Sequence, residues 1–355
     1  MALLIISRRK FAGLVGTGPI IGARAGLERI AYGGPTSIRV AAVQMTAQLA
    51  DVNANLLKAE RLARLAFKRG ARWVVLPEFF TSAIAFHPDM AKATEEVDGR
   101  PSELLCRLAR ESKAFVGGSF LAWRGGNAYN SFILALPNGK TLRHDKDYPS
   151  YWEACYYVGG SDDGVLSTPD GNVGVALCFE FVRSRTAARL KGKVGMVVGG
   201  SCWWGMEDTA RADHPLRKWL LDLLQATPGR FARLLGVPVI HASHAGRFEG
   251  RSWPGEPTPF PSSYLGETQI VNGRGEILAR MAREDGEGVI TADVALGEVP
   301  GERVAIPDRF WIPEMPAEEI RQWRAQLKSG HEFYVSNTLP ALKRRFNRSV
   351  TPTRD

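Results

Sequence analysis

Three residues whose side chains can do chemistry stand where apolar stretches of the sequence end. Glu78 closes the run that begins at Trp73, Lys146 lies just after another apolar run, and Cys178 closes a third. A charged residue directly after an apolar run is costly unless it is paired or at the surface. In sheets with helical crossovers, functional sites gather at the ends of strands. A carboxylate, an ammonium group and a thiol in equivalent places therefore predict one shared site.

Cys178 taken alone has a simpler interpretation, because free cysteine usually packs like a small hydrophobic residue. The other three cysteines are Cys106, Cys155 and Cys202, and no C-x-x-C or zinc-like spacing occurs. This spacing argues against a disulfide framework and against a structural metal site. We expect Cys155 and Cys202 to pack near the site without taking part in the chemistry.

Three histidines offer a second candidate partner for the thiol. His144, His241 and His244 invite a Cys-His arrangement of the papain type. No papain-type sequence surrounds Cys178, and the G-x-C-x-G elbow of glutamine amidotransferases is absent. A histidine in an apolar strand is more often a core residue with satisfied hydrogen bonds, so we favour the carboxylate and the lysine as partners.

The elements that must position these residues alternate between strand and helix from Ser37 onward. Strands are expected within 37–45, 71–80, 114–123, 128–149, 172–181, 193–204, 237–246, 267–281 and 288–294, and helices within 51–70, 101–112, 183–190, 316–327 and 216–235, the last interrupted near TPGR. Helical crossovers mixed with hairpins predict an α/β fold with mixed sheets and helices outside. Residues 247–266 are rich in Pro and Gly. They predict a long loop that borders the site and governs substrate size, with Trp253 and Phe260 covering an apolar pocket.

The order of the motifs resembles that of the nitrilase superfamily of carbon–nitrogen hydrolases. The matching stretches are IRVAAVQM, WVVLPEFF, VGGSF, YNSFILALPNGKTLRHDK, GNVGVALCFEF and LGETQIVNGRGEILA, from about Ile38 to Val294. The resemblance implies a four-layer α-β-β-α sandwich that forms a homodimer and needs no cofactor or metal. It places the family's Glu-Lys-Cys triad on Glu78, Lys146 and Cys178, and a frequent second glutamate on Glu153.

The resemblance implies a role for each of these residues in breaking a carbon–nitrogen bond. A thiol with a pKa near ~8.5 is little ionised at neutral pH, so Glu78 would take its proton and later pass it to the departing amine. Lys146 and the backbone N–H of Phe179 would stabilise the oxyanion. A thioester would form and be hydrolysed. Glu153 would orient Lys146 or the water, and Glu180 would serve a backbone N–H or Arg183 as a structural partner.

The substrate is less well defined than the reaction. The aromatic-acid pair Phe179-Glu180 resembles amidases and carbamoyl-amine hydrolases, whereas true nitrilases usually carry tryptophan after the cysteine. We therefore expect an amidase-type hydrolase, with a nitrilase as the alternative and a catalytically inactive scaffold as an alternative of another class. Four aromatic residues either line an apolar acyl pocket or belong to the core: Tyr151, Trp152, Trp203 and Trp204.

The two ends of the chain differ from its middle. Residues 1–35 contain Arg8-Arg9 before a short Gly-rich apolar stretch, which resembles a twin-arginine export signal and predicts a periplasmic protein, with a cytoplasmic one as the alternative. Residues 36–300 form the expected catalytic domain, and 301–355 an arm that contacts the partner of a dimer. Although the net charge is +9, no basic and aromatic stripe predicts nucleic-acid binding, and no apolar stretch predicts a stable membrane span.

Overall fold

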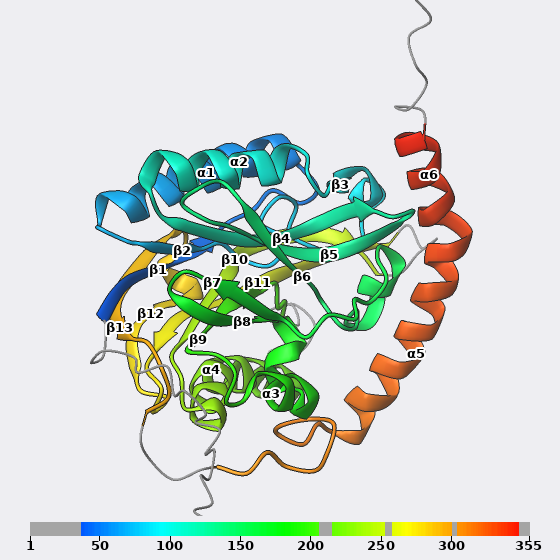
Figure 1. Ribbon diagram of the computed structural model, residues 1–355. Helices are drawn as coiled ribbons and strands as arrows, with labels where there is room; N and C mark the ends of the chain where they lie inside the picture. Colours follow the sequence, from blue (N-terminus) through cyan, green and yellow to red (C-terminus); the bar gives the residue numbers. More distant parts are fainter. Residues whose placement is uncertain (1–36, 206–214, 253–257, 300–303, 348–355) are drawn as a thin grey trace, which may run out of the picture. The chain divides into compact units, whose positions relative to one another are not determined.

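The structure is a computed structural model that describes residues 37–205, 215–252, 258–299 and 304–347. The expected export signal therefore lies outside the described residues. The described part contains thirteen strands and six α-helices, joined by turns and short helices of other types (Figure 1).

The strands form one mixed sheet that nearly closes on itself and has two halves. The first half has the order β6-β5-β4-β2-β1, with β13 beside β1 and β3 beside β4. Its strands are β1 (Ser37–Met45), β2 (Trp73–Val75), β3 (Glu95–Glu96), β4 (Phe115–Arg124), β5 (Asn127–Ala135), β6 (Thr141–Asp145) and β13 (Gly288–Ala295).

The second half has the order β10-β9-β8-β7, with β11 beside β10 and β12 beside β11. Its strands are β7 (Val165–Thr168), β8 (Gly171–Leu177), β9 (Met196–Ser201), β10 (Val239–Arg251), β11 (Pro259–Val271) and β12 (Ile277–Ala282). The halves join where β1 and β10 run parallel, through the pairs Gln44–Ser243 and Met45–His244.

The alternation of side chains along a strand explains why both faces of each half are apolar. In β1, Ile38, Val40 and Ala42 point into a core between the halves, which also holds residues of β8, β9 and β10. Ala41 and Val43 point the other way, into a core beneath the first two helices. Since successive side chains face opposite sides of a strand, a continuous apolar run supplies two cores at once.

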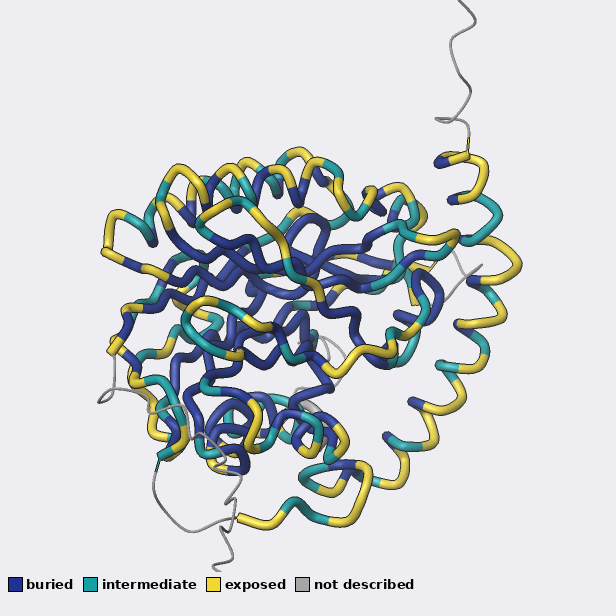
Figure 2. The backbone as a smooth tube through the Cα atoms, in the orientation of Figure 1, coloured by how far each residue is buried: buried dark blue, intermediate teal, exposed yellow. Residues whose placement is uncertain are grey.

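Helices cover the outer face of each half. The first half lies beneath α1 (Val52–Lys68) and α2 (Arg100–Ser112), and the second beneath α3 (Ser184–Leu190) and α4 (Pro215–Leu235). Figure 1 shows the resulting layers, and in Figure 2 the buried chain lies between helices whose outer faces are exposed. The predicted four-layer α-β-β-α arrangement with mixed pairing is confirmed. None of the described helices is long and apolar enough to cross a membrane.

Helix ends follow local sequence signals, but α4 departs from the prediction. Asp51 caps α1 by accepting a hydrogen bond from the Ala54 N–H at 3.0 Å. We expected a break near TPGR, yet α4 continues through Pro228. Proline inside a helix costs about 3 kcal/mol. Burial of Phe231 and Ala232 against the sheet offsets that cost.

The segment 247–266 is mostly a long hairpin, and the predicted loop is wrong over most of its length. β10 and β11 pair from Val239–Val271 to Arg251–Pro259, and Phe260 lies opposite Gly250. Pro259 is the first residue of β11, a position where the missing N–H of proline is tolerated. Residues 253–257, with the expected cover Trp253, lie outside the described residues.

The C-terminal arm is longer and more buried than the sequence suggested. Instead of ending near Leu327, α5 (Ala317–Phe333) continues through a π-helical turn, η5 (Tyr334–Thr338), into α6 (Leu339–Asn347). The α6 residue Phe346 stacks on Trp123 of β4, with ring centroids 5.2 Å apart. The arm therefore packs on its own chain, and its expected contact with a partner chain stays a prediction.

Candidate active site

Glu78 lies just beyond β2, and its carboxylate is fully buried. Oε1 accepts hydrogen bonds from Asn130 Nδ2 and Lys146 Nζ, each at 2.9 Å, and Oε2 accepts one from the Cys202 N–H at 3.0 Å. Asn130 lies within β5, Lys146 directly follows β6, and Cys202 directly follows β9. They fix the orientation of the carboxylate at the same end of the sheet where Lys146 and Cys178 lie.

Lys146 follows β6 directly and is equally buried. Its Nζ donates to Glu78 at 2.9 Å and to Glu153 Oε2 at 2.8 Å. Glu153 lies on the short helix η2 (Tyr151–Cys155) and also accepts hydrogen bonds from the Ser150 N–H, at 2.9 Å, and from the Tyr157 hydroxyl. Burial opposes the charge on Lys146, but Glu153 and Glu78 outweigh it and raise its pKa well above the usual range.

Cys178 is the first residue after β8 and opens the short helix η3 (Cys178–Val182). Its φ of +51° lies in the left-handed region, which is uncommon for any residue except glycine. Two neighbours of the catalytic cluster share this feature, Phe79 at +52° and Tyr151 at +53°. Such strained residues persist where surrounding contacts over-determine the backbone, which is common at functional sites.

The thiol and two carboxylates form one compact cluster. Ligand atoms of Glu78, Glu153 and Cys178 all lie within 4.8 Å of one another. A thiol and two carboxylates also form a donor set for a divalent metal. Here, however, the Lys146 ammonium group is bonded to both carboxylates and already supplies the positive charge. The cluster suits proton transfer next to a nucleophile.

The electrostatics of the cluster keep the proton on the resting thiol and make Glu78 its natural acceptor. Burial, and then the charge of Glu153, raise the pKa of Glu78 to about 7, against the lowering effect of Lys146. Burial and the Glu78 charge raise the pKa of Cys178 well above its usual range, although Lys146 and the Phe179 N–H lower it. The resting thiol is therefore protonated at neutral pH, and Glu78 has the affinity for protons that a general base needs there.

A buried network of charges holds the turn that presents Cys178. Glu180 accepts hydrogen bonds from the Leu177 N–H at 2.9 Å, from the Asp147 N–H at 3.1 Å and from Arg189 at 2.7 Å. Its expected structural role at a backbone N–H agrees with this geometry. The arginine partner is Arg189 rather than Arg183, whose guanidinium pairs with Asp147. Glu180 thereby links Leu177, which precedes Cys178, to Asp147, which follows Lys146.

The three histidines have partners other than the thiol sulfur. His144 lies between Asp162 and Glu180, His241 contacts the Ser201 hydroxyl at 2.8 Å, and His244 Nε2 contacts the Glu78 carbonyl at 2.8 Å. Burial lowers the pKa of both His241 and His244 to about 4, so they are neutral. This arrangement favours the core interpretation of the histidines over Cys-His chemistry.

The remaining candidate residues divide between two aromatic clusters. Phe179 contacts Tyr151 and Trp203, with ring centroids 5.6 and 4.9 Å apart, and all three pack in one cluster with Cys178. Trp152 instead stacks on Trp204, in a neighbouring cluster that also contains Cys155 and Cys202. Tyr151 and Trp203 therefore share a cluster with the thiol, whereas Trp152 and Trp204 belong to the neighbouring one.

Sequence reasoning missed several residues that complete the site. Asn130 and Tyr157 bond the two carboxylates, and Glu319 of α5 accepts a hydrogen bond from the Tyr151 hydroxyl at 2.6 Å. Asn130 lies inside the quoted motif YNSFILALPNG, which was a usable signal. Nothing in the local sequence of Tyr157 or Glu319 indicates that they belong to the site.

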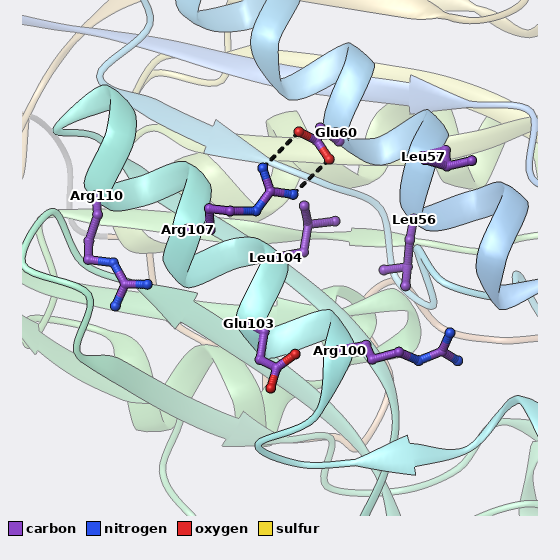
Figure 3. A pocket seen from close by; sticks show the side chains of 8 residues that line it. All are labelled: Leu56, Leu57, Glu60, Arg100, Glu103, Leu104, Arg107 and Arg110. Atoms are coloured by element: carbon purple, nitrogen blue, oxygen red, sulfur yellow. Dashed lines mark hydrogen bonds and ion pairs between the residues drawn. The ribbon is translucent and has the colours of Figure 1, made fainter.

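Two surface grooves lie outside this cluster. One of about 410 Å³ lies between α1 and α2, where Glu60 pairs with Arg107 through two hydrogen bonds at 2.8 and 2.9 Å (Figure 3). Arg107, burial and Arg64 together shift the Glu60 pKa to about 2, with the arginines prevailing. The other groove, of about 480 Å³, lies beside the arm. It is lined by Tyr148, Arg309, Phe310, Trp311, Glu314, Met315, Ile320, Trp323 and Arg324.

Comparison with known proteins identifies relatives over most of the chain. The family described as carbon-nitrogen hydrolase matches residues 39–301. A nitrilase of Pyrococcus abyssi is 26% identical over 272 residues, which are 75% of this chain and 93% of that protein. An omega-amidase of Xenopus tropicalis is 29% identical over 273 residues, 72% of this chain and 88% of that protein. The crystal structure of a carbon–nitrogen hydrolase from Helicobacter pylori has the same fold, with a TM-score of 0.61 at 17% identity over 73% of this chain and 89% of that one.

Proposed function

The chain belongs to the carbon–nitrogen hydrolase family, and on this premise we propose that it hydrolyses a small amide through a thioester on Cys178. The observation that carries the proposal is the cluster itself. A thiol and two carboxylates lie within 4.8 Å of one another, and a buried lysine is bonded to both carboxylates. A nucleophile, a base and a fixed positive charge are the groups that acyl transfer needs.

The proposed first half-reaction forms the thioester. Glu78 takes the thiol proton, and the sulfur attacks the carbonyl carbon of the amide while the C=O electron pair moves to oxygen. The Lys146 ammonium group and the Phe179 N–H stabilise that oxyanion. The oxyanion then collapses, the carbon–nitrogen bond breaks, and Glu78 returns its proton to the departing nitrogen. Ammonia or an amine leaves, and the acyl group remains on sulfur.

The proposed second half-reaction consumes water. Glu78 removes a proton from the attacking water molecule, hydroxide adds to the thioester, and the carbon–sulfur bond breaks. The thiolate takes the proton back from Glu78, and a carboxylic acid is released. Glu153 takes no proton in this scheme. Its bonds to Lys146, to the Ser150 N–H and to the Tyr157 hydroxyl support the role of orienting the lysine.

A nitrile is the second candidate substrate, because a relative named nitrilase covers as much of the chain as the amidase does. Phe179, where true nitrilases usually carry tryptophan, favours the amide. An inactive scaffold is disfavoured by the intact set of thiol, carboxylate and lysine. Selective, pH-dependent alkylation of Cys178 by iodoacetamide would separate an enzyme from such a scaffold.

The direct test is ammonia release from matched pairs of amides and nitriles that share one alkyl chain. We expect the amide to have the higher kcat/KM in each pair. A higher value for the nitriles would make the protein a nitrilase. Absence of ammonia from both series, together with an unreactive Cys178, would support the scaffold.

A further inference from the structure

The arm brings a residue from outside the family's matched segment to the edge of the catalytic cluster. Helix α5 lies beyond residues 39–301, yet its buried face contacts η2, the helix that carries Glu153. That face contains Glu319, Trp323 and Gly330. A Cβ on Gly330 would lie 3.0 Å from the Ala154 Cβ, so helix and loop are in close contact.

Glu319 is a nearly buried carboxylate with a neutral partner. Only 7% of its surface is exposed, and its Oε2 accepts a hydrogen bond from the Tyr151 hydroxyl at 2.6 Å. Burial and the Glu319 carboxylate raise the pKa of Tyr151 above its usual range, so the phenol keeps its proton. Among the described residues, no lysine, arginine or histidine forms an ion pair with Glu319. Glu319 lies in the first turn of α5, where the helix dipole favours a negative charge, and a cationic ligand would supply the paired charge that the carboxylate lacks.

Aromatic rings pack around Tyr151, the hydrogen-bond partner of Glu319. The Tyr151 ring packs on Phe179, Phe179 contacts Trp203 and Trp311, and Trp311 contacts Trp323 with ring centroids 5.1 Å apart. Aromatic faces attract organic cations, with an effect of about 0.5–2 kcal/mol that is largest where water is excluded. A buried carboxylate bound to the edge of such a cluster offers the chemistry that an ammonium group needs.

The other charges of the arm are placed differently. Arg309 and Arg324 line the outer groove, and Arg309 lies 3.6 Å from Glu314. The neighbouring Glu318 is exposed and pairs with Arg321. Of the two acidic residues in this helix turn, Glu319 is therefore the buried one, and it contacts the aromatic cluster through Tyr151.

We propose that Glu319 is a specificity residue that selects amides with an ammonium group, or a similar organic cation, at the end distant from the scissile bond. This inference rests on the proposed function, because it concerns the substrate of the same thiol. The acyl chain would extend from Cys178 past Phe179 and Tyr151, and its cation would lie against Glu319 and the surrounding rings.

The test compares three amides of matched length that differ only at the far end. These are δ-aminovaleramide, which is cationic, hexanamide, which is neutral, and the monoamide of glutaric acid, which is anionic. We expect the wild type to prefer the cation over the neutral chain by about tenfold or more in kcat/KM, as a charge-assisted hydrogen bond allows. The anionic chain should be the poorest substrate.

The substitution Glu319→Gln should reduce the cation-to-neutral ratio by about tenfold and improve the anionic amide relative to hexanamide. Glu318→Gln removes the same charge from the exposed face of the same turn and should leave the ratio unchanged. An equal loss for all three amides in Glu319→Gln would make the residue a structural latch and overturn the inference. A wild type that prefers the anionic chain would also overturn it.

A binding measurement keeps this test separate from the proposed reaction. In the Cys178→Ala variant, calorimetry of the three amides reads the same preference without turnover. No preference for δ-aminovaleramide in binding or in turnover would contradict the role of Glu319. By contrast, a wild type that binds the cationic amide best but hydrolyses no amide would contradict the proposed function and leave the specificity inference standing.

Discussion

At the scale of single residues, the lysine is the group whose proposed role is most open to measurement. Lys146 is fully buried and bonded to two carboxylates, so its charge is fixed before any substrate arrives. A preorganised charge of this kind acts on the oxyanion without reorganising during the reaction. It differs from a substrate-binding lysine, which would change KM rather than kcat.

Replacing Lys146 by methionine should therefore lower kcat by about 100-fold or more, because a lost oxyanion donor typically costs that much. The exposed Lys140 replaced by methionine is the matched control and should behave like the wild type. Steady-state kinetics on one amide measure both variants. A change confined to KM would assign Lys146 to substrate binding instead.

Glu78 predicts the pH dependence of the reaction. Its pKa is raised to about 7, chiefly by burial, and only the ionised carboxylate can accept the thiol proton. kcat/KM should therefore rise with pH through about 7 and fall tenfold per pH unit well below it. Glu78→Gln should remove this rise of kcat/KM with pH together with the activity. A rise of kcat/KM centred near the ordinary pKa of glutamate would show that Glu78 does not carry the titrating proton.

The sequence led to Glu78, Lys146, Cys178 and Glu153 because each lies in or beside a motif with a recognisable order. Tyr157 and Glu319 were missed for a physical reason. Their functional partners come from tertiary contacts, and no local pattern marks a tyrosine that bonds Glu153 or a glutamate that approaches Tyr151 from a distant helix. Such residues can be found only when the fold brings the segments together.

At the scale of elements, the arm determines the position of η2. The Thr338 hydroxyl donates to the Cys155 carbonyl at 2.6 Å, and the Tyr334 hydroxyl accepts the Ala128 N–H at 2.9 Å. Gly330 approaches Cys155 so closely that a Cβ would lie 3.2 Å from its backbone nitrogen. The arm thus supports the helix whose Glu153 orients Lys146.

Gly330→Val should push α5 away from η2 and lower kcat by about tenfold or more, because small displacements of an orienting group are costly in catalysis. Overpacking should also reduce stability by about 1–3 kcal/mol. Gln322→Val places the same β-branched residue on the exposed face of the same helix, where nothing is overpacked, and serves as the control. Thermal unfolding and kinetics check the prediction, and unchanged kcat in Gly330→Val would separate the arm from the active site.

The hairpin of β10 and β11 shows which elements local sequence cannot predict. Pro259 and Pro261 indicate a loop by composition, but they lie at the start of β11, where the strand pairs with β10. Tertiary pairing therefore tolerates residues that disfavour a central strand. Phe260 contacts Trp204, with ring centroids 5.5 Å apart. The expected influence of this segment on substrate size stays a prediction.

At the scale of the whole molecule, the alternation of apolar runs and amphipathic helices predicted a mixed sheet with helices outside, and the family resemblance implied the four layers. The continuity of the two sheet halves through β1 and β10 did not follow from the sequence, since it depends on two residue pairs at the strand ends. The homodimer stays a proposal, supported by the resemblance. Sedimentation equilibrium should give twice the mass of one chain, and a monomer would contradict it.

The location of the protein is a further proposal at this scale. Residues 1–35, with the Arg8-Arg9 pair, should direct a folded passenger across the inner membrane, because the transport machinery reads that pair. The test fuses them to a fluorescent protein that matures only if it folds before export. Periplasmic fluorescence is expected, and Lys at both positions should abolish it. Retention in the cytoplasm of a host with a compatible transporter would favour the cytoplasmic alternative.

The central claim is that Cys178 forms a thioester during hydrolysis of an amide. Intact-protein mass spectrometry of enzyme quenched in acid during turnover tests it most directly, with peptide mapping to locate the adduct. The account predicts a mass increase equal to the acyl group on Cys178, and neither adduct nor ammonia release from the Cys178→Ala variant. An acyl group on Cys155 or Cys202, or ammonia release by Cys178→Ala at the wild-type rate, would contradict it.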